Sequence, residues 1–230
     1  MTQHANPAPV ITIDGPTASG KGTVTRLVAQ ALKFHVLDSG ALYRLTAWAA
    51  LDQNVDPNDI AKVADLARRM QVRFSGQHVY LAGVDVTESI RQEHVGSLAS
   101  RLAPQPTLRE ALLERQREFQ KAPGLVADGR DMGTIVFPDA ELKVFLTAKA
   151  QARAKRRCEQ LRERGVTPDE QAVLLDLQKR DERDTKRSIA PLLPAEDAHQ
   201  IDSSELSIDE TVQQISSLWQ TTVAQTKNIL

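Results

Sequence analysis

The chain has a single cysteine, no long apolar run and almost no net charge. Cys158 has no partner for an intrachain disulfide, which is typical of proteins kept in a reducing compartment. No apolar run approaches the roughly 18–20 residues that cross a bilayer, and the first residues lack the apolar core of a secretory signal. We therefore expect a cytoplasmic protein, without a membrane partner, whose residues 1–9 form a disordered tail.

The net charge and the aromatic content are also low. A net charge of −1 over 230 residues gives no general attraction to nucleic acid or to anionic membranes. Aromatic residues make up 4% of the chain and do not interleave with the basic residues, as they do on many RNA-binding surfaces. The histidines lie far apart and give no zinc spacing. Any phosphate chemistry must therefore come from local clusters of basic residues.

A glycine-rich loop follows the first apolar run, Val10–Asp14. The next seven residues match G-x-x-x-x-G-K, a loop that cradles phosphates between a strand and a helix: Gly15, Pro16, Thr17, Ala18, Ser19, Gly20 and Lys21. Glycine lets backbone N–H groups close around a phosphate, and the lysine adds a point charge. A chance glycine loop is the alternative, but helical spacing after Lys21 argues against it. The sequence thus predicts that Gly15–Thr23 binds a nucleoside triphosphate.

The residues after the lysine narrow the class. Gly22 follows Lys21, and the hydroxyl expected near Mg²⁺ arrives one place later, at Thr23. This GKGT ending resembles the loop of nucleoside monophosphate kinases. The guanine-reading tetrapeptide N-K-x-D is absent. A switch GTPase is therefore not expected.

Short apolar runs alternate with helical patterns along the chain. The predicted strands are Val10–Asp14, His35–Asp38, Leu125–Asp128, Leu142–Leu146 and His199–Asp202. This rhythm predicts an α/β fold, a parallel β-sheet with helices on both faces. Ligands of such sheets bind at the carboxyl ends of the strands. The residues that follow Asp14, Asp38 and Asp128 are therefore the candidates for a site.

Two further patterns refine the prediction. Gln71–Phe74 and His78–Ala82 form a hairpin signal, which Val84–Val86 extends. Together with the flanking helices, Asp52–Ala103 is predicted to be an insertion in the α/β fold. Capping patterns predict that helices begin at Thr107, Thr167 and Ser207.

Two groups of polar residues follow the second and third strands. In the first, Ser39 is a candidate N-cap, Tyr43 lies near the first helical turn, and Arg44 can place two hydrogen bonds on a phosphate. An ordinary capped helix with a surface arginine is the alternative. In the second, Arg130 and Asp131 follow Gly129 at a strand end, where they would lie beside bound phosphates.

A third group lies on one helix that ends before Pro191. Arg180, Arg183, Asp184 and Arg187 recur at spacings of three and four. A solvated helical hairpin with many ion pairs explains most charges of this segment. An arginine face beside a triphosphate has another use: it closes as a lid, excludes water and stabilises charge on a transferring phosphoryl group.

Four motifs in this order, GPTASGKGT, LDSGALYR, ADGRDMGT and KRDERDTKRSIAP, resemble bacterial cytidylate kinases. The likeness covers about residues 9–217, including the VRFSGQ…VYLAGVDVTESIR insert. It implies transfer of the γ-phosphate of ATP to CMP or dCMP with Mg²⁺. It also implies three parts: a core (10–39, 104–152 and 192–230), an insert that binds the nucleoside monophosphate (40–103) and a lid (153–191).

The resemblance also assigns roles to single residues. Arg44 and Arg130 would grip the CMP phosphate, with Ser39 and Tyr43 completing the wall of the acceptor site. The base would be read by Ser100, Arg109 and Asp131, and the ribose contacted by Arg180 and Asp184. Arg187 would face the phosphates from the lid, Arg157 would contact ATP, and Thr23 would lie near the metal. The catalytic set would be Lys21, Arg130, Asp131, Arg180 and Arg187.

Rival functions remain open at this stage. A P-loop kinase acting on UMP or AMP differs only in nucleotide selectivity. A nucleotide-responsive regulator without catalysis would bind ATP without turnover and bind polyanions in a salt-dependent way. The near-neutral charge argues against that regulator and against a nucleic-acid partner. Family likeness favours a monomer.

Overall fold

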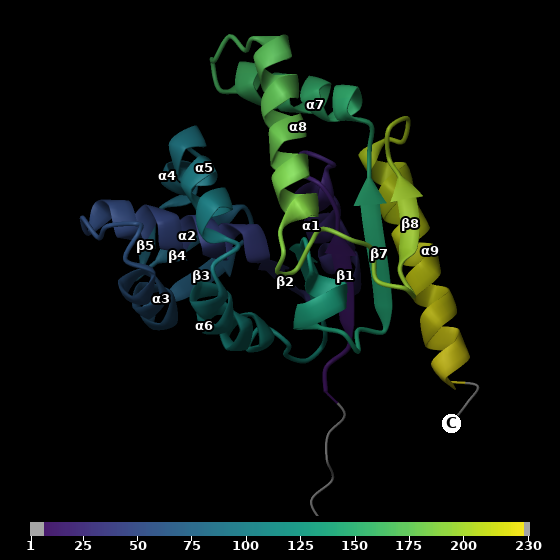
Figure 1. Ribbon diagram of the computed structural model, residues 1–230. Helices are drawn as coiled ribbons and strands as arrows, with labels where there is room; N and C mark the ends of the chain where they lie inside the picture. Colours follow the sequence, from purple (N-terminus) through teal and green to yellow (C-terminus); the bar gives the residue numbers. More distant parts are fainter. Residues whose placement is uncertain (1–6, 228–230) are drawn as a thin grey trace, which may run out of the picture.

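A computed structural model describes residues 7–227 of the chain (Figure 1). Most of the predicted tail, residues 1–6, lies outside the described residues. Pro7–Pro9 lead directly into the first strand. The carbonyl oxygen of Ala8 accepts a bond from Gln120, and that of Pro9 accepts one from the backbone of Leu125. Ala8 and Pro9, at the end of the predicted tail, are thus hydrogen-bonded to the rest of the protein.

The central element of residues 7–227 is a five-stranded sheet in the order β2-β6-β1-β7-β8. Its strands are β1 (Val10–Asp14), β2 (His35–Asp38), β6 (Leu125–Gly129), β7 (Leu142–Thr147) and β8 (His199–Asp202). All neighbouring strands run parallel. The predicted α/β fold is confirmed, and each strand lies within one residue of its predicted bounds.

Helices cover both faces of this sheet (Figure 1). The elements are α1 (Lys21–Leu32), α9 (Ile208–Lys227), α2 (Ser39–Asp52), α6 (Pro106–Arg117) and the π-helix η1 (Met132–Val136). Ile11 and Ile13 of β1 pack with side chains of α1 and α9, whereas Val10 packs with α2 and α6. Burial on both faces explains the continuous apolar run of β1.

The segment between α2 and α6 lies beside the sheet. It contains α3 (Ile60–Arg69), β3 (Val72–Ser75), β4 (His78–Leu81), β5 (Val84–Asp85), α4 (Thr87–Ile90) and α5 (Glu93–Leu102). Among the described residues, β3, β4 and β5 form one antiparallel sheet, as the hairpin signal predicts. Val63, Val79 and Val95 belong to the same buried cluster as Leu37 and Leu125. The insertion therefore packs on the core of the main sheet.

Two helices lie beyond the carboxyl ends of the strands (Figure 1). They are α7 (Ala150–Glu163) and α8 (Glu170–Lys186). Both fall in the predicted lid. Across residues 7–227 no helix is sufficiently long and apolar to span a membrane.

Three predicted helix starts are wrong, and one is confirmed. Asp38, not Ser39, caps α2, because its carboxylate accepts from the N–H of Ala41. Asp169, not Thr167, caps α8 in the same way, since a carboxylate is a strong acceptor at the positive end of a helix. The third, α6, begins one residue before Thr107, at Pro106, whose fixed φ suits the first helical position.

The predicted capping box at the start of α9 is confirmed. The Glu210 carboxylate accepts from the backbone of Ser207, and the Ser207 hydroxyl accepts from the N–H of Glu210. These two reciprocal bonds satisfy donors that the first helical turn leaves free.

Candidate active site

The P-loop (Gly15–Thr23) connects β1 to α1. Gly15 has φ +149°, and a Cβ there would collide with the Leu146 carbonyl oxygen of β7. Gly20 adopts φ +95° directly before α1. The loop therefore needs glycine at both ends, one for close approach and one for backbone conformation. The N-terminus of α1 faces the loop, so its free N–H groups and dipole favour an anion there.

Lys21 is buried at the start of α1. Its ammonium donates to the Pro16 carbonyl at 2.8 Å and lies 4.0 Å from the Asp128 carboxylate. Burial, followed by the charge of Arg130, lowers the pKa of Lys21 to about 8. Burial also raises the pKa of Asp128 to about 7, against the opposing effect of Lys21. Burial removes water from Lys21, so its ammonium would attract a nearby phosphate more strongly than an exposed lysine would.

The carboxyl ends of the strands meet as predicted. Asp38 of β2 pairs in register with Asp128 of β6, and Asp14 of β1 pairs with Gly129. Arg130 follows at this edge. Its guanidinium donates to the Thr17 hydroxyl of the P-loop at 2.6 Å and to Asp184 of α8 at 2.9 Å. Arg130 thus connects the donor loop to the lid helix.

Burial works against the charge of Arg130, but Asp184 and Asp128 raise its pKa above the ordinary value. This guanidinium is therefore charged at any physiological pH. A permanent cation between the P-loop and the lid suits a reaction that gathers negative charge at that point.

Four side chains form what we call the acceptor wall: Tyr43, Arg109, Asp131 and Arg187. The Arg109 guanidinium contacts the Asp131 carboxylate and donates to the Tyr43 hydroxyl at 3.3 Å. Burial raises the pKa of Tyr43 to about 12, so its hydroxyl keeps its proton. The wall offers both a carboxylate and hydrogen-bond donors to a polar ligand.

Arg187 closes this wall from the end of α8. Burial lowers its pKa, whereas the facing Asp131 and Asp184 raise it. Its Nε donates to the Ala190 carbonyl, but its buried Nη2 has no hydrogen-bond partner within the described chain. A buried guanidinium nitrogen without a partner is costly and suits contact with an anion.

Two more arginines lie side by side over α5. A Cβ on Gly96 would lie 3.8 Å from the guanidinium groups of both Arg44 and Arg180. Burial, followed by the charge of Arg44, lowers the pKa of Arg180 to about 10. Glu93, at the start of α5, contacts Arg180. Neighbouring buried cations of this kind favour an anionic ligand between the insertion and the lid.

Comparison with known proteins identifies the family. The family model for cytidylate kinase matches residues 11–221. The cytidylate kinase of Bordetella bronchiseptica is 58% identical over 219 residues, covering 95% of this chain and 98% of that protein. The chain belongs to the cytidylate kinase family. The cytidylate kinase of Ralstonia pickettii is 54% identical and covers 93% of both chains.

The family is one of kinases, so this chain is a phosphotransferase. Among solved structures, a gluconokinase from Sinorhizobium meliloti aligns over 96% of this chain and 97% of its own, at 16% identity and a TM-score of 0.46. That likeness is too slight to bear on function.

Within residues 7–227, four of the site residues predicted from the cytidylate kinase likeness make no hydrogen bond to the acceptor wall, and their roles stay predictions. Ser39 donates to Gln116 of α6, and Thr23 accepts from Arg26 of its own helix. Ser100 is half-buried on α5. Arg157 donates to Glu93, not to the P-loop. In the described part of the chain, no hydrogen bond joins Ser39, Ser100 or Arg157 to the P-loop or to the acceptor wall. Thr23 lies at the end of the P-loop, and its N–H donates to the Gly20 carbonyl at 3.1 Å.

Two arginines that sequence reasoning did not select do contact the P-loop. Arg153 donates to the Thr17 carbonyl at 3.1 Å and pairs with Asp181 of α8. Arg156 donates to the Ser19 carbonyl at 3.1 Å. The sequence held a signal for these contacts. Both arginines lie in the first turns of the helix after β7, and because β7 lies beside β1, that helix must begin beside the loop. Arg157, one position further, faces the insertion.

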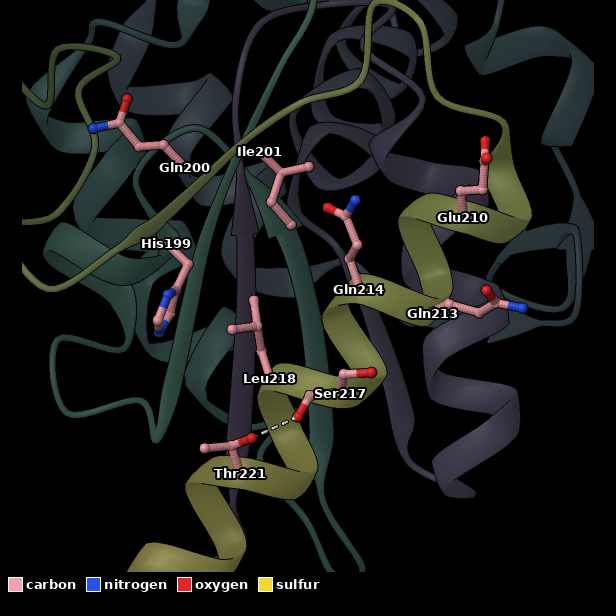
Figure 2. A pocket seen from close by; sticks show the side chains of 9 residues that line it. All are labelled: His199, Gln200, Ile201, Glu210, Gln213, Gln214, Ser217, Leu218 and Thr221. Atoms are coloured by element: carbon pink, nitrogen blue, oxygen red, sulfur yellow. Dashed lines mark hydrogen bonds between the residues drawn. The ribbon is translucent and has the colours of Figure 1, made fainter.

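One cavity of the described residues lies away from these groups. Its volume is about 650 Å³, and it lies between β8 and α9, where Gln214 and Leu218 approach the strand (Figure 2). Neither element supplies a predicted site residue. Its lining is mostly amide and hydroxyl groups with one carboxylate, Glu210, which already caps α9. We assign it no part in phosphoryl transfer.

Proposed function

We propose that this kinase transfers the γ-phosphoryl group of ATP to CMP or dCMP, giving ADP and CDP or dCDP. The observation that carries the proposal is the position of Arg130, which bonds to Thr17 of the P-loop and to Asp184 of the lid helix. One side of this arginine faces the donor loop, and its neighbour Asp131 belongs to the acceptor wall. A donor and an acceptor phosphate held on either side of it would be aligned for direct transfer.

The donor half is assigned to Gly15–Thr23. Backbone N–H groups and Lys21 would hold the β- and γ-phosphates, and Arg153 and Arg156 would keep the loop in shape through Thr17 and Ser19. Phosphoryl transfer has a loose transition state, so catalysis rests on alignment and charge stabilisation rather than on a strong base. Lys21, Arg130 and Arg187 supply that charge.

The acceptor half is assigned to the wall and the arginines beside it. Arg44 and Arg130 would bind the CMP phosphate, and Arg180 and Asp184 the ribose. The Asp131 carboxylate would accept a hydrogen bond from the exocyclic amine of cytosine, with Arg109 holding it in place. Uracil would place a carbonyl oxygen against this carboxylate in place of the amine, which would disfavour UMP.

Mg²⁺ belongs to the same proposal. Across residues 7–227 no cluster of three His, Cys, Asp or Glu side chains forms a metal cage. This fits Mg²⁺, which binds through one or two protein groups together with substrate phosphates and water. The Thr23 hydroxyl, at the start of α1, would supply a ligand. When bound, the ion would neutralise charge on the phosphates.

A monomer acting in the cytoplasm completes the proposal. The cytoplasmic location is supported by the lone Cys158, which is buried. The net charge of −1 offers no general attraction to nucleic acid, and the monomer rests on family likeness. Size-exclusion chromatography with light scattering tests the monomer directly.

The deciding experiment is ADP release in a coupled assay with Mg-ATP and CMP, dCMP, UMP, AMP or GMP, beside a control without acceptor. We expect strong turnover with CMP and dCMP and little with the purine nucleotides. Turnover with UMP or AMP alone would overturn the cytosine assignment but keep the kinase. ATP binding with no turnover on any acceptor would overturn the kinase proposal.

A further inference from the structure

Asp14 is a buried carboxylate with no assigned role. It is the last residue of β1 and stands directly before Gly15 of the P-loop. Its two oxygens accept from the backbone N–H groups of Met132 at 2.9 Å and Gly133 at 2.8 Å. These are the two residues that follow Asp131. One side chain thus links the start of the donor loop to the segment that carries the base-reading carboxylate.

We propose that Asp14 is a positioning residue that fixes Asp131 for recognition of cytosine. The inference rests on the proposed function, in which Asp131 accepts from the exocyclic amine. Asp131 lies between Arg130, which contacts the P-loop, and Met132, which Asp14 holds. Its backbone is therefore restrained on both sides by the donor loop, and the selectivity for the acceptor base depends on a residue that need not touch that base.

The local backbone explains why a carboxylate is needed. Met132–Val136 is a short π-helix, whose first N–H groups have no partner within the helix. Its far end is closed by Ile135 and Val136, whose N–H groups donate to the Asp131 carbonyl. Asp14 satisfies the two N–H groups at the near end. Without it, two buried donors beside Asp131 would be left unpaired, and the segment would shift to find partners.

Close packing adds to this restraint. A Cβ on Gly133 would lie 2.9 Å from the Thr12 hydroxyl oxygen and 3.2 Å from the Lys143 side chain. The segment after Asp131 therefore rests directly on β1 with no space for a larger residue.

The charge of Asp14 suits the role. Burial raises its pKa to about 6, although the bonds from Gly133 and Met132 lower it. Asp131, Lys21, Asp128 and Arg130 are charged groups that act on it from the neighbouring elements. At pH 7.5 the group is ionised, and both oxygens accept. An asparagine of the same shape has one accepting oxygen, and its NH₂ group would face the second donor.

The test compares Asp14→Asn with Thr12→Val. Thr12 is a matched control because it lies on the same face of β1, is fully buried, and has a hydroxyl without a hydrogen-bond partner in the described chain. For Asp14→Asn we expect kcat/KM with CMP to fall by at least about tenfold, the cost of a charged hydrogen bond. The value with UMP should fall less, so the CMP-to-UMP ratio drops, while the Kd for ATP changes less than about twofold.

Thr12→Val should keep the wild-type ratio. Amide exchange of Met132 and Gly133, which requires no substrate, should be faster in Asp14→Asn and unchanged in Thr12→Val. This readout separates failure of the inference from failure of the proposed function. If the wild-type enzyme showed no turnover with CMP, the proposed function would be wrong, whatever the exchange rates of the Met132 and Gly133 amides.

A second variant covers the case in which Asp14→Asn does not fold. Gly133→Ala disturbs the same link from the other side, by contact with Thr12. Its CMP-to-UMP ratio should fall, and Thr12→Ala in the same chain should restore part of it by giving the new methyl group space. A folded Asp14→Asn or Gly133→Ala enzyme with the wild-type ratio would overturn the proposal. A loss of ATP affinity equal to the loss for CMP would also overturn it.

Discussion

The donor and acceptor halves of the site are built in different ways. The P-loop consists of consecutive residues whose backbone, between two glycines, forms the binding surface. The acceptor wall instead collects side chains from α2, α6 and the residues that follow α8 and β6, and Arg109 joins two of them, Tyr43 and Asp131. A backbone loop fixes a common group such as a triphosphate with little conformational freedom. Long side chains in paired networks can fit a particular nucleotide and can move with the lid.

This comparison predicts the largest effect for the one side chain on which the donor half depends. Lys21→Ala should lower kcat by roughly a thousandfold, because in the proposed mechanism this cation stabilises charge on the transferred phosphate. The protein should stay folded, as judged by circular dichroism. Lys62→Ala, an exposed lysine of the insertion, is the control. A kcat near that of the wild type would remove the P-loop lysine from the mechanism.

A smaller effect is expected for the arginine that closes the acceptor wall. Arg187→Ala should lower kcat about a hundredfold and raise the KM for CMP less than about tenfold, if its free nitrogen acts mainly on the transition state. Steady-state kinetics at saturating ATP measures both. Arg183→Ala, an exposed arginine on the same helix, is the control. An effect confined to KM would place Arg187 in ground-state binding.

Loss of a contact between the P-loop and the lid helix should have a smaller effect again. Arg153 joins the P-loop carbonyl of Thr17 to Asp181 of the lid helix. Asp181→Asn should lower kcat/KM for ATP about tenfold and reduce the free energy of unfolding by about 1–3 kcal/mol, because Arg153 is buried and loses a charged partner.

The pair of Arg162 and Glu170 provides a matched control for this link. It also joins α7 to α8, but both side chains are more than half exposed. Glu170→Gln should change neither quantity by more than the small amount expected of a surface ion pair. Equal effects of the two substitutions would mean that any bond between α7 and α8 serves as well.

The last prediction concerns the stability of the donor half and not its activity. The pKa of Lys21 is lowered to about 8 in the folded protein, against 10.5 for an ordinary lysine. Between these values the unfolded chain binds more protons, so this group makes the protein more stable as pH rises from about 8 to 10.5. Lys21→Met should lose that rise. Urea unfolding of both proteins at pH 8 and pH 10 measures this change in the free energy of unfolding. An equal change in the two proteins would contradict the burial of the Lys21 charge.

The same contrast explains what could be read from the sequence. The P-loop was predictable because its chemistry lies in consecutive residues, and the strands because Val10–Asp14 and Leu125–Gly129 are buried on both faces. The hydrogen-bond partners of several other polar side chains were not predictable. Nothing local indicates that Ser39 donates to Gln116, or that Arg153 rather than Arg157 reaches the loop. These contacts follow from how helices after neighbouring strands are placed.

Helix starts failed for a related reason. Several residues near Thr107 and Thr167 can each cap a helix, and small differences in geometry decide among them. At α8 the Asp169 carboxylate forms the cap, two residues beyond the threonine. A sequence pattern locates such a start to within a turn.

The order of strands in the sheet has a consequence for how the protein is made. Val10 pairs with Leu125, and the partner on its other side, β7, comes later still. At about 5–20 residues per second, a ribosome needs on the order of ten seconds to reach β6 after completing β1. Throughout that interval the strand that leads into the P-loop has neither neighbour, while the whole insertion is synthesised. The nucleotide-binding end of this enzyme is thus first in the chain, but its sheet cannot form until more than half of the chain has been made.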